Sequence, residues 1–173
     1  SAKILVISRD DRLSGIYNCI VQDFYTGTYQ ALLDAKDKIQ RYRRLFLSFP
    51  GKSFCPESLK EGFEAFCNDH QIEHEVIDSL DHHQIRKGNA YLVIDDTDLI
   101  QLLKACQNHN WQLARDVGVI SYNETALKEV IRDGITVISC DFSQMAQEMV
   151  NFIRNRTNVR MNIPISLISR KSL

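Results

Sequence analysis

Short, continuously apolar segments recur along the chain and predict buried β-strands. Runs of this kind, flanked by polar residues, are typical of strands that are covered on both faces in a parallel sheet. The segments are KILVIS (3–8), LFLSF (45–49), EVID (75–78), AYLVID (90–95), VGVIS (117–121), ITVIS (135–139) and IPISLI (163–168).

Amphipathic segments between these strands predict helices, because their apolar residues recur at the three- to four-residue spacing that places them on one helix face. The apolar stripes are Ala31, Leu32, Ala35 and Ile39 in 24–41; Leu59, Phe63 and Phe66 in 56–67; Leu99, Leu102, Leu103 and Cys106 behind an Asp96 or Thr97 N-cap; Ala126, Leu127, Val130 and Ile131; and Met145, Ala146, Met149, Val150 and Ile153. Strands alternating with helices predict right-handed βαβ units. The expected fold class is therefore α/β, with a doubly wound, mostly parallel sheet.

Ligands of open α/β sheets bind beyond the carboxyl ends of the strands, so the residues that follow each predicted strand form the candidate site. These residues are Arg9 and Asp10, Ser53 and Phe54, 79–83, Asp95 and Asp96, and Tyr122 and Asn123. Several are short polar groups that can hydrogen-bond the hydroxyls of a small polar ligand.

The carboxylates at one of these positions have two interpretations. Asp95 and Asp96 open a predicted helix, where a carboxylate caps backbone amides. Alternatively, they bind Mg²⁺ with Asp98 as a third ligand. The chain has no Gly-x-Ser-x-Gly elbow, no Cys-x-x-Cys pair and no complete phosphate-binding loop. We therefore predict no catalytic residue, no metal site and no cofactor.

Composition places the chain among globular proteins, with 173 residues, 44% of them hydrophobic, and a net charge of -1. This charge does not favour nucleic acid as a direct partner. No apolar run approaches the roughly 20 residues of a membrane span, and the N-terminus lacks a signal-peptide pattern. Five widely spaced cysteines, an odd number, indicate reduced core thiols. The prediction is a cytoplasmic protein without a membrane partner.

Several segments together resemble the effector-sensing core of the lactose-repressor (LacI/GalR) family of bacterial transcriptional regulators, which has a periplasmic-binding-protein-like fold. The matching segments follow the order of the family: KILVISRD (3–10), IVQDFYTGTYQAL (20–32), KEGFEAFC (60–67), the block 96–125 ending in ARDVGVISYNET, GITVIS (134–139) and IPISLISRKSL (163–173). More narrowly, FYTGTYQALL (24–33), ISYNETALKEVI (120–131) and GITVISCDFSQMA (134–146) resemble the branch that is fused to a winged-helix DNA-binding domain of the gluconate-repressor (GntR) type.

The resemblance implies that residues 1–173 form a partial effector-binding domain, made of a C-terminal lobe and a remnant of an N-terminal lobe. The DNA-binding domain and most of the N-terminal lobe are then absent from this chain. Family members have two lobes joined by three crossovers, and the 3–8 segment is expected to be the last strand of the first pass through the N-terminal lobe.

The implied function is allosteric control of operator binding by a small carbohydrate, in a homodimer. Asp96 lies at the acidic position of the family and is expected to accept hydrogen bonds from sugar hydroxyls. Arg9 as a donor and Ser53 with Phe54, an apolar wall, are the further ligand-binding candidates.

Two departures from the family pattern limit this inference: Leu59 stands in place of an arginine, and Ser8 in place of an aspartate. The sugar preference of other members is therefore not transferable. Leu59 in place of a polar contact favours a deoxy sugar such as L-fucose. Two alternatives stay open, a periplasmic-type sugar-binding protein and a Mg²⁺-dependent phosphoryl-transfer or receiver-like domain that uses Asp95 and Asp96.

Overall fold

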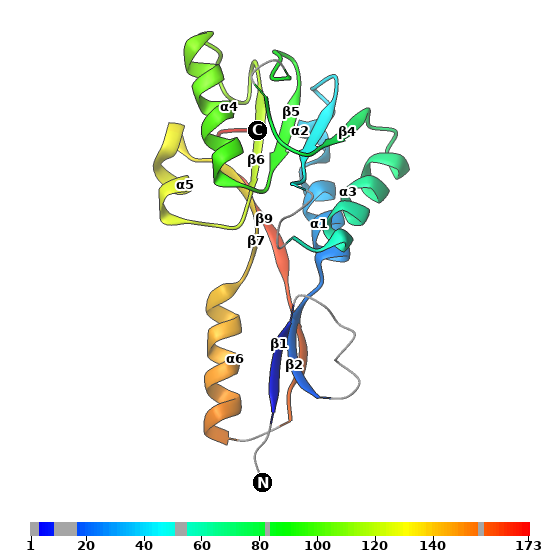
Figure 1. The fold of residues 1–173 in the computed structure, drawn as a ribbon, viewed down its shortest axis with the longest axis vertical. Helices are drawn as coiled ribbons and strands as arrows, with labels where there is room; N and C mark the ends of the chain where they lie inside the picture. The colour runs from blue at the N-terminus through cyan, green and yellow to red at the C-terminus, as the bar shows by residue number, and fades with distance from the viewer. Residues whose placement is uncertain (1–3, 9–16, 51–54, 82–83, 156–157) are drawn as a thin grey trace.

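The computed structural model describes residues 4–8, 17–50, 55–81, 84–155 and 158–173. Within these ranges the chain forms two separate β-sheets, one of six strands and one of three (Figure 1). We call the six-stranded sheet with its helices α1 to α5 the large lobe, and the three-stranded sheet with helix α6 the small lobe. The two lobes meet at a narrow waist.

The sheet of the large lobe has the strand order β4-β3-β5-β6-β7-β9. All neighbours are parallel except β7 and β9, which pair antiparallel. The predicted doubly wound, mostly parallel sheet is confirmed. Its strands are β3 (Leu45–Ser48), β4 (His74–Ile77), β5 (Ala90–Val93), β6 (Gly118–Tyr122), β7 (Thr136–Cys140) and β9 (Ile165–Ile168).

Helices cover both faces of this sheet, and each face has its own apolar core. Helices α1 (Phe24–Asp34), α2 (Lys36–Ile39) and α3 (Glu57–Asp69) pack on one face with the side chains of Ile120 and Ile138. Helix α4 (Asp96–Asn108) packs on the other face with Val119 and Val137. Alternate residues of a strand point to opposite faces, so continuously apolar strands serve both cores. A side chain at Gly62 would collide with the carbonyl oxygen of Tyr25, which shows how closely α3 approaches α1.

The short helix α5 (Ala126–Val130), which lies on the same side as α4, contradicts the apolar stripe predicted for it. Leu127 and Val130 are 64% and 71% exposed, and Lys128 is the buried residue of this helix. The helix is followed by a 3₁₀ turn (Ile131–Asp133) and by Gly134 at φ 103°, a conformation that glycine adopts without strain, and the chain then enters β7.

The small lobe contains two strands that the apolar pattern missed, β2 (Asn18–Gln22) and β8 (Arg160–Ile163). They pair in parallel with each other, and β1 (Leu5–Ser8) pairs with β2. Helix α6 (Phe142–Asn155) runs alongside this sheet (Figure 1). It buries Met145 and Phe152, whereas Val150 and Ile153 of the predicted apolar stripe are exposed.

Three crossovers join the lobes, as the family resemblance implies. The chain passes from β2 to α1 at Asp23, from β7 to α6 at Asp141, and from β8 to β9 at Pro164. The Asp141 amide donates to the Pro164 carbonyl (3.3 Å), so two crossovers touch at the waist. The first crossover follows β2, so the 3–8 segment lies one strand earlier than expected. Across the described residues, no helix is long and apolar enough to cross a membrane.

Candidate functional site

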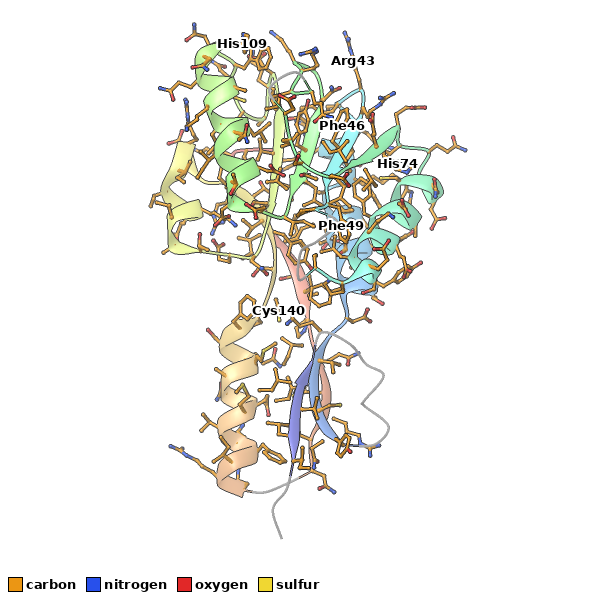
Figure 2. All side chains as sticks on the ribbon, in the orientation of Figure 1. Arg43, Phe46, Phe49, His74, His109 and Cys140 are labelled. Carbon is orange, nitrogen blue, oxygen red and sulfur yellow. The ribbon has the colours of Figure 1, made fainter. Side chains whose placement is uncertain are left out.

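The carboxyl ends of β5, β6 and β7 lie at the waist, and we call this end of the large sheet the carboxyl edge. Figure 2 shows Cys140, the last residue of β7, at the waist, with Arg43 and His109 at the opposite end of the large lobe. Residues that follow the strands at this edge therefore face the small lobe, where a ligand held by both lobes would lie.

Asp95 is the N-cap of α4, whereas the sequence predicts Asp96 or Thr97. Its carboxylate accepts a hydrogen bond from the Thr97 amide (2.6 Å). This amide, with a smaller contribution from the Thr97 hydroxyl, holds the pKa of Asp95 below its usual value. Asp95 therefore serves the helix terminus, the first of the two interpretations given by the sequence.

Asp96, the acidic residue predicted to bind ligand, projects from the first turn of α4. Its side chain is 64% exposed, and its Oδ1 lies 2.9 Å from the Nζ of Lys128, whose side chain is only 4% exposed. The same Nζ donates to the carbonyl oxygens of Tyr122 and Asn123, each at 2.9 Å. The ion pair thus joins the start of α4 to the end of β6.

Asn123 occupies the turn between β6 and α5 and presents an exposed side chain at the carboxyl edge. Its φ is 62°, a left-handed conformation that asparagine adopts more readily than most residues. Its amide donates to the Ile138 carbonyl at 2.8 Å, which fixes the turn against β7.

Asp98, the third carboxylate of the proposed Mg²⁺ set, is buried and serves a different purpose. It accepts hydrogen bonds from the Ser48 hydroxyl and from the Leu80 amide (3.3 Å for the amide). It therefore ties α4 to the end of β3 and to the loop after β4. Among the described residues, no group of three or more His, Cys, Asp or Glu side chains could hold a metal ion.

Tyr122 lies beneath the carboxyl edge, on the face of the sheet that α1 covers. Its ring stacks on Phe24 with a centroid distance of 6.2 Å. Its hydroxyl and that of Thr28 are buried and have no hydrogen-bond partner among the described residues. Burial raises the pKa of Tyr122. Tyr122 is thus part of the support beneath the site, and its ring is covered.

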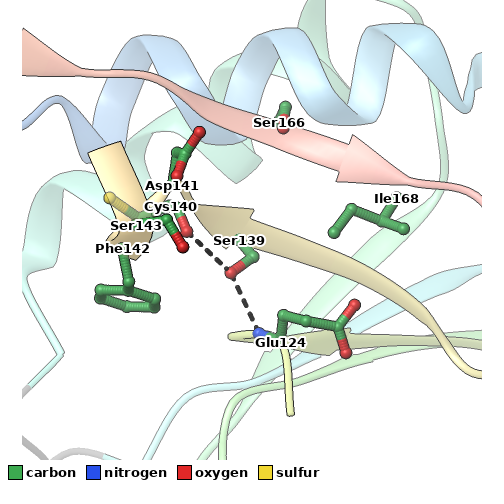
Figure 3. A pocket seen from close by; sticks show the side chains of 8 residues that line it. All are labelled: Glu124, Ser139, Cys140, Asp141, Phe142, Ser143, Ser166 and Ile168. Carbon is green, nitrogen blue, oxygen red and sulfur yellow. Dashed lines mark hydrogen bonds between the residues drawn. The ribbon is translucent and has the colours of Figure 1, made fainter. Parts of the chain in front are cut away.

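An open pocket of about 340 Å³ lies at the waist, between β7, β9 and the start of α6 (Figure 3). This volume is at the lower end of the roughly 300–1,000 Å³ of small-molecule sites. The pocket is lined by Glu124, Ser139, Cys140, Asp141, Phe142, Ser143, Ser166 and Ile168.

The two acidic groups of this pocket are already engaged within the protein. Glu124 pairs with Arg170 at 2.5 Å, and Asp141 caps α6 by accepting from the Gln144 amide at 2.8 Å. Burial, with a smaller effect of Asp141, raises the pKa of the Cys140 thiol to about 11. The pocket therefore offers hydroxyl groups and apolar surface, with a thiol that stays neutral.

Of the four predicted ligand-binding residues, the structure describes only Asp96. Arg9, Ser53 and Phe54 lie outside the described residues. Leu59, which motivates the deoxy-sugar prediction, is fully buried in the core, so its side chain does not line the carboxyl edge.

Sequence reasoning missed three residues of this region. Two of them could have been found by the same search for residues that follow strands. Asp141 follows the ITVIS segment, and Glu124 is the residue after Asn123. Lys128 has no comparable signal, because lysine on a short helix is ordinarily a solvent-exposed residue.

Comparisons with known proteins agree with this geometry. Among solved structures, the Escherichia coli transcriptional repressor ascG is 16% identical over 98% of this chain and 68% of its own length, with a TM-score of 0.77. A Lac repressor bound to ONPG in the repressed state is 18% identical over 98% of this chain and 56% of its own, with a TM-score of 0.74. A LacI family transcriptional regulator from Enterococcus faecalis with bound ribose is 16% identical over 98% of this chain and 68% of its own, with a TM-score of 0.72.

The chain thus spans between about half and about two thirds of the length of these structures, and at such identities the likeness concerns the fold. No match is found among curated protein sequences. Residues 40–173 match the family model of the periplasmic binding protein-like domain. The resemblance to LacI/GalR regulators is confirmed, and this chain belongs to the periplasmic binding protein-like domain family.

Proposed function

We propose that this chain is part of the effector-sensing domain of a DNA-binding transcriptional regulator, and that a small carbohydrate binds between the lobes at the carboxyl edge. The observation that carries the proposal is the waist itself, where three crossovers meet the polar ends of β5, β6 and β7. The names of the structural neighbours support it, because they include repressors and a regulator with bound ribose.

Asp96 is the main acceptor of the proposed site. Its carboxylate is exposed at the edge, and a carboxylate that accepts a hydrogen bond from a ligand hydroxyl discriminates strongly against ligands that lack that donor. Asn123, the next exposed polar residue of the edge, supplies both a donor and an acceptor. We retain Arg9, Ser53 and Phe54 as proposed contacts on the strength of the sequence.

The small lobe supports the proposal that the polypeptide extends beyond this chain. Ile4, just before β1, and Ile7 on β1 are exposed, as are Val150 and Ile153 on α6. Exposed apolar side chains on a parallel edge strand are unusual, because parallel sheets are normally covered on both faces. We propose that the rest of an N-terminal lobe covers them, and that a winged-helix DNA-binding domain belongs to the same polypeptide.

Control of DNA binding then follows from lobe movement. A sugar that contacts both lobes stabilises one relative arrangement over others, and the crossovers transmit that preference. In a homodimer located in the cytoplasm, the arrangement of the lobes sets the spacing of the two DNA-reading heads, which must match the operator half-sites.

A thermal-shift experiment on the full-length protein tests this function. The panel contains neutral monosaccharides including L-fucose, sugar phosphates and Mg²⁺. A sugar at 100 times its Kd is expected to stabilise the native state by about 2.7 kcal/mol, which raises the Tm by several degrees. Asp96→Ala should abolish the shift. Asp37→Ala should keep it, since Asp37 is likewise an exposed aspartate in the first turn of a helix, α2, but outside the site.

The other outcomes contradict the proposal in distinct ways. A shift with Mg²⁺ alone supports the phosphoryl-transfer alternative. A sugar shift that survives in Asp96→Ala removes Asp96 from the site. No shift with any sugar rejects the carbohydrate effector.

A further inference from the structure

The ammonium group of Lys128 is a buried positive charge in the large lobe. Lysine is rarely buried, because removing its charge from water is costly unless strong acceptors replace the water. Here three acceptors do so at 2.9 Å each: Asp96 Oδ1 and the carbonyl oxygens of Tyr122 and Asn123. The ammonium group has three N–H donors, so all of them are used.

This saturation decides what Lys128 can do at the carboxyl edge. A lysine with all donors engaged has none left for a ligand. Its effect on an effector must therefore pass through the groups that it holds, which are Asp96 at the start of α4 and the turn at the end of β6.

The backbone of Lys128 is also fixed, so the clamp has a firm base. Its amide donates to the Thr125 carbonyl at 3.0 Å, and its carbonyl accepts from the Ile135 amide at 2.8 Å, at the start of β7. Lys128 thus connects the start of α4, the end of β6 and the residue that precedes β7.

The ion pair leaves Asp96 half engaged. Lys128 bonds Oδ1, whereas Oδ2 has no partner in the part of the chain that the structure describes, and the side chain is exposed. An aspartate held by one oxygen presents the other in a fixed place, which lowers the ordering cost of binding. The two carbonyl bonds hold the left-handed Asn123 turn in the same way.

We propose that Lys128 is a positioning residue of the effector site: it fixes Asp96 and the Asn123 turn where an effector hydroxyl meets them, without touching the effector. This inference rests on the proposed function. It adds the residue that sets the geometry of the site and limits Asp96 to a single oxygen for the ligand.

Hydrogen exchange on the full-length protein without ligand tests the clamp. In Lys128→Met, the Asn123 and Glu124 amides should exchange about tenfold faster or more, because the turn opens more often. Lys87→Met is the matched control, since Lys87 also pairs with an aspartate, Asp116, at 3.0 Å but away from the site. Unchanged exchange in Lys128→Met overturns the proposal.

A double-mutant cycle for binding separates positioning from simple structural support. With the sugar that stabilises the wild type, Asp96→Asn and Lys128→Met should each weaken binding about tenfold. If Lys128 acts through Asp96, the Kd of the double variant should be no higher than that of the single variant that binds more weakly. Losses that multiply to about a hundredfold overturn the proposal, because Lys128 would then act independently of Asp96.

Failure of the two proposals is distinguishable. A wild type that binds no sugar rejects the proposed function and with it the effector role of Lys128. A wild type that binds a sugar with the same Kd as Lys128→Met rejects the role of Lys128 alone.

Discussion

The two ends of the large sheet each hold one lysine–aspartate pair, and the pairs differ in which partner is buried. At the carboxyl edge, Lys128 is 4% exposed and Asp96 64% exposed. At the opposite end, Lys87 is 59% exposed and Asp116 only 6%. The distances are nearly equal, 2.9 and 3.0 Å, so burial and not geometry distinguishes the pairs.

The buried carboxylate of Asp116 is fully used by the protein. One oxygen accepts from the Gln112 amide at 3.0 Å, and the other pairs with Lys87 and lies 3.5 Å from Arg115. The backbone amide of Asp116 also donates to the Gln112 carbonyl at 2.8 Å. Asp116 therefore fixes the loop before β6 and has nothing to offer a ligand.

At the carboxyl edge the arrangement is reversed, and the acid faces outward. Burying the cation keeps its charge inside the lobe, where it meets two carbonyl oxygens as well as Asp96. The comparison teaches that a short distance between opposite charges does not by itself identify a functional pair. The exposed partner does, because only an exposed group can exchange its water for a ligand.

The comparison predicts the largest stability loss for Lys128→Met. The change removes the donor of two carbonyl oxygens, and each buried group left without a partner costs about 1–3 kcal/mol. We expect the free energy of unfolding to fall by about 2–4 kcal/mol, measured by urea denaturation with a fixed m-value. A loss below about 1 kcal/mol would show that water replaces the ammonium group and that the clamp is weak.

A smaller, pH-dependent effect is expected for Asp116→Asn. The Gln112 amide, followed by Lys87, holds the pKa of Asp116 below its ordinary value of 3.8. A carboxyl with a lowered folded-state pKa stabilises the fold above pH 3.8 and loses that contribution as the pH falls through the folded-state pKa. The stability difference between wild type and variant should therefore be largest near neutral pH and shrink as acid is added. A difference that stays constant with pH would contradict this account of Asp116.

The strands of the large lobe were predicted from their apolar sequences, whereas β2 and β8 of the small lobe were missed. LFLSF and ITVIS are apolar at every position but one or two, because each lies between two covered faces. β8, with the sequence RMNI, alternates polar and apolar residues, and only Ile163 of the four is buried. Such alternation is typical of a half-buried strand, but a search for continuously apolar runs does not find it.

At the site, the sequence located positions but not partners. The search for residues after strands found Asp96 and Asn123, because chain order alone places them at the edge. The burial of Lys128 was not predictable, and the apolar stripe of α5 indicated the reverse orientation. The three oxygen acceptors come from α4, β6 and the turn after it, and only the folded chain brings them together. These three bonds hold Lys128 of α5 toward the protein, and Leu127 and Val130 of the same helix face outward.

The smallest change in the free energy of unfolding is expected for Lys87→Met, and this variant is the most direct test of the comparison. If an ion pair stabilised by distance alone, this change would match Lys128→Met, since the two pairs are equally close. Lys87, however, is exposed, and Asp116 keeps its bond from the Gln112 amide and the charge of Arg115 after the substitution. Exposed pairs contribute about 0–1 kcal/mol, so we expect a loss of no more than about 0.5 kcal/mol in the same urea experiment. A loss equal to that of Lys128→Met would mean that both ends of the sheet depend on their ion pairs alike, and burial would no longer separate a structural pair from one that serves a site.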